Sequence, residues 1–340
     1  ALTLTQGSGA NVVIAAGQTK IVATDGAGSG AIVYEMDDLE LAGNLTVTGV
    51  LDVDGTANLD IIDVDGAANF AADVTFADGA DIITASAGTS NTRIGVNAGN
   101  SIASGGNYNV VVGDEAGTAI TTGDDNVAIG YAALDAEDTG SRAVAVGSNA
   151  LTAQNKDGNT YNVAVGYNAG TAVTTGIRNN FFGAEAGEAL TEGTDNIAIG
   201  YQTLTADTLG SRSVAIGNNA LDAQNFTTAT SAYNVAVGQA AGGAVTTGTL
   251  NTLIGGLAGD ALTSGNNNTA VGYLALSADT LGDRNTAIGN SALAAQNFTT
   301  TTDSYNTAVG FTAGASITTG VQNTLIGGLA GDAITDADAN

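Results

Sequence analysis

The feature that most constrains this chain is a short unit, clearly visible in Asn268-Thr-Ala-Val-Gly-Tyr-Leu-Ala-Leu, that recurs fourteen times between residues 91 and 340. The glycine at its centre, taken as position 0, falls at residues 95, 113, 130, 147, 166, 183, 200, 217, 238, 255, 272, 289, 310 and 327. The intervals between these glycines are mostly 17 residues, with 18 once, 19 once and 21 twice. A fixed short period predicts stacked units that bury their apolar side chains only against neighbouring units.

Each unit follows strict rules around its glycine. Position −1 is Ile, Val or Phe in all fourteen copies, position −4 is Asn in twelve, and position +3 is Ala in thirteen. Position +4 runs in the order Gly, Gly, Leu, Leu, so that four units form a super-repeat, which runs from Gly166 to Gly238 and again from Gly238 to Gly310. Units with Gly at +4 carry an aliphatic residue at +7, such as Val173, whereas units with Leu at +4, such as Leu134, carry Ala at +6. This alternation predicts one bulky side chain per unit in a narrow core.

These rules predict an all-β fold, a parallel β-solenoid (β-roll) of about fourteen coils with 17 to 21 residues per coil. We expect two short strands per coil, each ended by a glycine turn. A helical fold is excluded because glycine and β-branched residues interrupt every window. The Asn at −4 can adopt a left-handed backbone, or its amide can bond to the same Asn one coil away. Coils stacked about 4.8 Å apart would extend about 65 Å.

Two further segments precede the solenoid, which we assign to residues 91–340. Residues 1–40 hold β-rich runs between turn signals and predict an N-terminal β segment. Residues 41–90 alternate apolar and polar residues before glycines, as in Leu51-Asp-Val-Asp-Gly, and predict a β-rich shaft. Its two Asp-Val-Asp-Gly stretches resemble the start of a calcium loop. Solvated aspartates explain them better, because the further oxygen ligands of such a loop are missing.

Composition argues against several classes of function. The chain has 34 Asp plus Glu against seven Lys plus Arg, a formal charge of −27, and neither His nor Cys. This charge disfavours binding to nucleic acid or to an anionic membrane surface. No apolar run approaches the roughly 20 residues of a membrane helix, so no membrane insertion is expected.

Catalysis has few residues available. Without His and Cys, the commonest general base and the thiol nucleophile are missing. Paired carboxylates could cleave a glycan, and the candidates are Glu115, Glu185, Glu188, Asp135, Glu137 and Asp138. Solvated turn carboxylates are the better interpretation. We therefore expect no enzyme activity, no cofactor and no metal site.

Longer connections interrupt every fourth coil, at residues 154–161, 224–233 and 296–305. Insertions in repeat proteins gather on one face, often the binding face, so these connections predict a row of loops. The candidate receptor contacts are the loop aromatic residues Phe226 and Phe298 and the tyrosines at the loop ends, Tyr161, Tyr233 and Tyr305. The favoured interpretation of the two phenylalanines is packing within the loops or between subunits, and that of the three tyrosines is packing at a corner or against a sister chain.

Two other patterns recur along the repeat. Tyr131, Tyr201 and Tyr273 share position +1 of successive super-repeats and should form a row. This row could stack a ligand, or it could pack at a corner or against a sister chain. Threonine pairs such as Thr121-Thr122 suggest an ice-binding solenoid, but the pair recurs only every fourth coil, so a flat threonine face is not expected.

The unit Asn-x-Ala-Val/Ile-Gly-x-x-Ala, as in Asn126-Val-Ala-Ile-Gly-Tyr-Ala-Ala, resembles the head repeats of trimeric autotransporter adhesins and, more closely, repeat arrays of bacteriophage tail fibres. The segment Leu45-Thr-Val-Thr-Gly is similar to shaft segments of phage fibres. This resemblance implies three parallel chains, each coiled as a left-handed β-roll. The coils are longer than those of adhesin heads. No coiled-coil stalk or membrane-anchoring barrel is visible, which favours the virus fibre.

The sequence therefore predicts a homotrimeric, non-enzymatic fibre of a phage tail that is extracellular on the virion and presents a host-binding surface. Its expected partners are copies of itself, other virion tail proteins, and a host cell-surface glycan or protein. The alternatives are a bacterial adhesin or extracellular filament subunit at the cell surface, and a polysaccharide-degrading tailspike.

Overall fold

The computed structural model describes residues 86–339 and, near the N-terminus, residues 2–4, 12–14, 16, 22–24 and 33–35. Contacts divide the chain into two units, Ala1–Thr75 and Phe76–Asn340. The described residues contain no helix. In the first unit, β1 (Leu2–Leu4) pairs antiparallel with β2 (Val12–Ile14), and β3 (Val22–Thr24) pairs antiparallel with β4 (Val33–Glu35).

These four short strands fall within residues 1–40. The predicted shaft, residues 41–90, lies outside the described residues except for its last five positions. The two Asp-Val-Asp-Gly stretches fall in that part and are not described.

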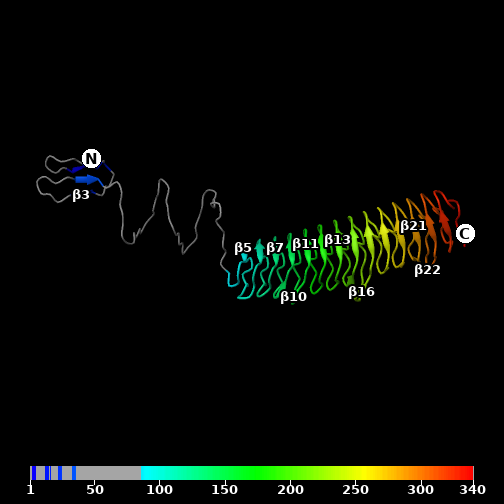
Figure 1. Ribbon diagram of the computed structural model, residues 1–340, viewed down its shortest axis with the longest axis horizontal. Helices are drawn as coiled ribbons and strands as arrows, with labels where there is room; N and C mark the ends of the chain where they lie inside the picture. The colour runs from blue at the N-terminus through cyan, green and yellow to red at the C-terminus, as the bar shows by residue number, and fades with distance from the viewer. Residues whose placement is uncertain are drawn as a thin grey trace. The chain divides into compact units, whose positions relative to one another are not determined.

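The second unit is a solenoid whose fourteen main strands form one parallel sheet in chain order (Figure 1). The strands occupy positions −3 to −1 of the coils, which we number 1 to 14. They are β5 (Thr92–Ile94), β6 (Val110–Val112), β7 (Val127–Ile129), β9 (Val144–Val146), β11 (Val163–Val165), β12 (Asn180–Phe182), β13 (Ile197–Ile199), β15 (Val214–Ile216), β17 (Val235–Val237), β18 (Thr252–Ile254), β19 (Thr269–Val271), β21 (Thr286–Ile288), β23 (Thr307–Val309) and β24 (Thr324–Ile326).

The stacking is in register, as the repeat predicts. Ile199 pairs with Ile216, and Ile216 pairs with Val237, so residues that share a position form columns along the solenoid. The fold class of a parallel β-solenoid with about fourteen coils is thereby confirmed.

The expectation of two strands in every coil is wrong. A second strand occurs in only three pairs of coils: β8 (Gly140–Ser141) with β10 (Gly158–Asn159), β14 (Gly210–Ser211) with β16 (Thr230–Ser231), and β20 (Gly282–Asp283) with β22 (Thr302–Asp303). Elsewhere the chain turns repeatedly into left-handed backbone after the central glycine, at positions +2 and +4. In coil 4 these are Asn149, with φ of 58°, and Leu151, with φ of 50°.

Hydrogen bonds between coils continue through these turns. Asn149 N–H donates to the carbonyl of Tyr131 one coil back at 2.9 Å, and Leu151 N–H donates to that of Ala169 one coil on at 3.1 Å. The backbone is therefore paired between neighbouring coils without being extended, which is why strand signals fail to mark this part of the coil.

The glycine at position 0 is required for two reasons. Its φ lies between 125° and 145° in all fourteen coils, a region that side chains with a Cβ rarely adopt. Its backbone also touches the glycine of the next coil: a Cβ added to Gly183 would lie 2.3 Å from the carbonyl oxygen of Gly200. The glycine column is thus a line along which the backbones of consecutive coils lie in close contact.

Position +4 follows a different rule. Leu204 adopts the same left-handed backbone (φ 54°) as Gly187 (φ 60°), so backbone conformation does not demand glycine there. Glycine is required there because a neighbouring side chain occupies the space. A Cβ on Gly187 would lie 2.3 Å from the ring of Phe181, and one on Gly170 would lie 2.8 Å from the same ring. Coils with Gly at +4 come in consecutive pairs. In the second coil of each pair, a large residue at position −2 therefore fills the space that the two +4 glycines leave.

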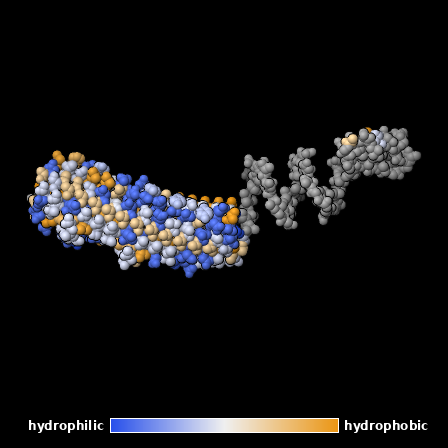
Figure 2. All heavy atoms as spheres, turned by 180° about the vertical axis from the view of Figure 1, so that it is seen from behind, coloured by the Kyte–Doolittle hydropathy of each residue, from blue (hydrophilic) through white to orange (hydrophobic). Residues whose placement is uncertain are grey.

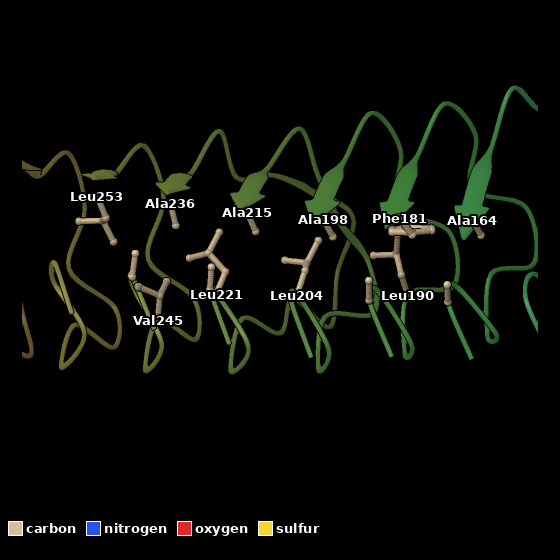
Figure 3. Close-up of a cluster of buried hydrophobic side chains, with 14 of the residues drawn as sticks. Ala164, Phe181, Leu190, Ala198, Leu204, Ala215, Leu221, Ala236, Val245 and Leu253 are labelled. Carbon is tan, nitrogen blue, oxygen red and sulfur yellow. The ribbon is translucent and has the colours of Figure 1, made fainter. Parts of the chain in front are cut away.

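The large residues that fill this role are Val111, Phe181, Leu253 and Leu325, whereas the −2 position of the remaining coils from coil 3 onward is Ala. In Figure 3 the side chains of Ala164, Phe181, Ala198 and Leu253 extend from the strands into the core, towards Leu190, Leu204, Leu221 and Val245 from the opposite side. The sequence rules at positions +4 and +7 predicted that each coil contributes one bulky side chain to the core. They did not show that position −2 also contributes to filling the core.

Replacing Gly183 with Ala should lower the free energy of unfolding by at least about 2 kcal/mol, because both the left-handed backbone and the close carbonyl resist a Cβ. Urea unfolding followed by circular dichroism measures this. Gly158, where φ is 81° and an added Cβ would meet nothing within 4 Å, is the matched control. Gly158→Ala should cost about 1 kcal/mol. Equal losses in the two variants would contradict the close-contact explanation.

Phe181→Ala should cost about 3–5 kcal/mol of local stability, since it empties the centre of two coils. Gly187→Leu alone should also destabilise, because the new side chain meets the Phe181 ring. Combined, the two changes should cost clearly less than their sum, since a leucine at +4 then occupies the vacated space. Amide hydrogen exchange of residues 163–221 measures each variant, and additive losses would refute the shared-volume rule.

Candidate functional site

A column of buried asparagines at position −4 lines the interior of twelve of the fourteen coils. Asn179 is typical: it is fully buried, its Oδ1 accepts the backbone N–H of Asn196 at 3.0 Å, and its Nδ2 donates to the carbonyl of Gly193 at 2.9 Å. The predicted bond to the next coil is therefore present, mainly to backbone groups. The left-handed residue lies one position earlier, at −5, as in Arg178 with φ of 57°. The expectation of left-handed backbone at −4 is wrong.

The asparagine column is interrupted at Ala143 and Ser213, and a buried carboxylate lies near each interruption. Asp207 Oδ1 accepts the backbone N–H groups of Gly210 at 3.0 Å and Phe226 at 3.1 Å. Its Oδ2 accepts Gln224 Nε2 at 2.6 Å. Gln224 Oε1 in turn accepts Asn234 Nδ2 at 2.9 Å. The result is a directed chain of hydrogen bonds that ends on the carboxylate.

The same acid–glutamine–asparagine triad occurs three times, once per super-repeat, and all nine side chains are buried. The triads are Glu137–Gln154–Asn162, Asp207–Gln224–Asn234 and Asp279–Gln296–Asn306. Burial raises the pKa of the three carboxyls, and their hydrogen-bond donors oppose that rise.

Sequence reasoning placed Glu137 among solvated turn carboxylates, and this is wrong: Glu137 is fully buried. A signal was present, because the acid and the glutamine that begins each long connection share position +7 of consecutive coils. Each triad attaches the start of a long connection to the coil before it.

The loop phenylalanines are not surface contacts. Phe226 and Phe298 are each only 6% exposed, and the backbone N–H of each binds the buried carboxylate of its triad. The prediction that these rings offer exposed receptor contacts is wrong. The alternative of packing within the loop explains them.

The tyrosines at the loop ends are exposed, and each is paired with an arginine. The guanidinium of Arg142 lies 6.0 Å from the ring centre of Tyr161, that of Arg212 lies 5.6 Å from Tyr233, and that of Arg284 lies 5.5 Å from Tyr305. The arginines also contact the second strands, at Asn159, Ser231 and Asp303. Such cation–π pairs keep the rings in place and leave about half of each ring accessible.

The predicted row at position +1 is also exposed, and it is longer than expected. Tyr131, Tyr201 and Tyr273 are joined in the same column by Tyr167 and Phe311, from coils 5 and 13. The prediction considered only the third coil of each super-repeat, which carries Tyr131, Tyr201 or Tyr273. Tyr167 and Phe311 lie on other coils and were therefore missed.

The outer face of the main sheet carries no charged residue in the part of the chain that the structure describes. In most main strands the central residue is buried and the two flanking residues, at −3 and −1, face outward. These flanking residues are all Val, Ile, Phe or Thr, apart from Asn180. Figure 2 shows apolar side chains in rows along the solenoid, among hydrophilic ones.

No family model, no curated protein and no solved structure is matched by this chain. Among the described residues, no helix is long and apolar enough to cross a membrane, and no group of three or more acidic, His or Cys side chains could hold a metal ion.

The buried carboxylates predict a specific pH dependence. Because their pKa is raised in the folded state, the folded chain binds more protons than the unfolded chain at pH values above the ordinary Asp value of 3.8. The free energy of unfolding should therefore fall as the pH rises through that window. Asp207→Asn/Asp279→Asn should flatten this slope.

Urea unfolding at a series of pH values measures the slope. The matched control is Asp332→Asn, which removes a carboxylate at an exposed position. An unchanged slope in the double variant would show that the two carboxyls do not titrate with raised pKa values.

Proposed function

We propose that this protein is a structural, non-enzymatic fibre subunit of a phage tail, that copies of it associate in parallel through the outer face of the main sheet, and that the assembly presents a host-binding surface. The observation that carries this proposal is the uncharged outer face on a chain of formal charge −27. In the solenoid, Asp and Glu occur at other positions of the coil and at neither −3 nor −1 of any coil.

The size of this face supports an interface. Fourteen strands about 4.8 Å apart, each about 10 Å long, make a surface of about 650 Å². Monomeric proteins rarely leave an apolar patch larger than about 300–600 Å² exposed, and a standard interface takes about 800 Å² from each partner. The −1 side chains of Ile94, Phe182, Ile199, Ile254, Ile288 and Ile326 are more than a third exposed in the single chain.

An identical chain is the partner that fits this face best. A second copy lying parallel has the same spacing between coils, so every strand of one copy meets an equivalent strand of the other. The absence of charge on the face also spares two strongly acidic chains from bringing carboxylates together. Closed rotational symmetry favours a defined small oligomer, and the resemblance to phage fibres and adhesin heads supports three chains and a left-handed coil.

The surroundings of the face suit a fibre. Hydrogen bonds join each coil to the next at several points of its circumference, so the solenoid is a continuous rod that can span distance. The triads hold the long connections against this rod, and the paired tyrosines at their ends remain accessible to a host receptor. Other virion tail proteins would hold the rest of such a fibre.

Lysines on the outer face should prevent association. Ile199→Lys/Ile254→Lys adds two charges to the face and should reduce the assembly to single chains in sedimentation velocity. Thr175→Lys/Thr247→Lys adds the same charge at exposed positions of other surfaces and should leave the assembly intact. A wild-type chain that sediments as a monomer at micromolar concentration would overturn the interface.

A second experiment tests whether the protein is located on the phage tail. Antibodies against residues 86–339 should label filaments that project from the tails of purified phage particles in electron microscopy. Labelling confined to bacterial surfaces would contradict the phage fibre function and favour a bacterial adhesin.

A further inference from the structure

Exposed aromatic side chains occupy position +1 on alternate coils. They are Tyr131, Tyr167, Tyr201, Tyr273 and Phe311, and they are between 47% and 60% exposed. The +1 residues between them are Ser148, Ala184, Asn218, Gly256 and Asn290, and only coil 9 breaks the alternation, with Gln239. Neighbouring aromatic residues two coils apart are about 9.6 Å from each other along the solenoid.

The small residues between the rings give them room to lie along the column. A Cβ added to Gly256 would lie 3.6 Å from Cδ2 of Tyr273, which is ordinary contact distance, so this ring rests on the neighbouring coil. A ring held in this way offers a flat surface at low cost in conformational freedom.

A ladder of polar side chains runs beside part of this column, at position +2. Asn149 Nδ2 donates to Asn168 Oδ1 at 3.1 Å, and Gln202 Nε2 donates to Glu185 Oε2 at 2.8 Å. From coil 9 onward the +2 position turns mostly apolar, with Ala240, Leu257 and Leu274. The aromatic column therefore runs beside a polar column, of four amides and the carboxylate of Glu185, only along the stretch from Tyr131 to Asn219.

We propose that this stretch binds a linear, uncharged polysaccharide that lies along the solenoid axis, with one aromatic ring for every second sugar. The proposal rests on the fibre function above and names the ligand class of its host-binding surface. Aromatic rings stack on the apolar faces of sugars, and the neighbouring amides can donate to and accept from sugar hydroxyls. The ring spacing is close to the length of a disaccharide in an extended β-linked chain.

Charge and periodicity select this ligand over others. The +1 column carries no charge between Tyr131 and Phe311, and the chain as a whole repels polyanions, so acidic glycans are disfavoured. A repeated, evenly spaced set of similar subsites matches a polymer with a repeating unit. A globular protein partner would instead be bound through a few clustered anchor residues.

The test uses the assembled wild-type protein and linear β-1,4-linked hexasaccharides of glucose and of N-acetylglucosamine, with hexagalacturonate as the acidic comparator, in isothermal titration calorimetry. At least one neutral hexasaccharide should bind and the acidic one should not. Tyr167→Ala and Tyr201→Ala should each weaken binding about tenfold. Tyr273→Ala and Phe311→Ala remove equivalent rings where the amide ladder is missing, and each should change affinity by less than about twofold.

Three results would overturn the proposal. The first is binding of neither neutral hexasaccharide by an assembly that is intact in sedimentation, which leaves the fibre itself standing. The second is dissociation of the assembly by Tyr167→Ala, which would assign the column to contact with a sister chain. The third is an equal loss of affinity in the Tyr273→Ala and Tyr167→Ala variants. Failure of the wild type to assemble would instead count against the fibre function.

Discussion

The structure depends on close approaches between the backbones of consecutive coils, of which the contact at the central glycine recurs in every coil but the last. Once Gly183 and Gly200 lie in contact, the distance between coils is set for the rest of the circumference. Every other regularity follows from that spacing. Strand residues pair with residues at the same position, the turns form hydrogen bonds between coils, and side chains fall into columns. A narrow core of Ala, Val, Ile and Leu is sufficient because each coil is covered on both sides by a copy of itself.

Burying polar side chains in such a thin core requires a complete set of partners. Most asparagines of the column meet this requirement as Asn179 does, by donating to one carbonyl and accepting one N–H. In each triad, an asparagine amide also donates to a glutamine, whose own amide then needs an acceptor. A carboxylate, which only accepts, ends that chain without leaving a donor unpaired. Among the described residues, Asp260 Oδ1 and Thr312 Oγ1 are the buried side-chain polar atoms without a partner.

Sequence alone predicted the features that derive from periodicity. Stacking, register, the number of coils and the alternation of core volume at Gly170 and Leu134 follow from residue positions counted from the glycine. Features that depend on contacts between columns could not be predicted in this way. The role of Phe181 is an example, because the side chain fills space above glycines of its own coil and of the coil before it.

The candidate site shows the same division. The sequence left open whether Tyr233 packs or is exposed, and it did not show that the backbone N–H of Phe226 binds a carboxylate in the coil before it. Glu137 was misplaced for a related reason. Its position on a turn suggests contact with water, and only the glutamine supplied by the next coil shows that it belongs to the interior.

The spacing of the triads also governs how the length of this protein can change. Removing one coil would break the order Gly, Gly, Leu, Leu at position +4 and so disrupt the packing of the core. If the removed coil has Leu at +4, a triad also loses its acid or its glutamine. Gain or loss of four coils preserves both relationships. Gene duplication or recombination would therefore lengthen or shorten the rod in increments of about 19 Å, each of which adds or removes one complete loop.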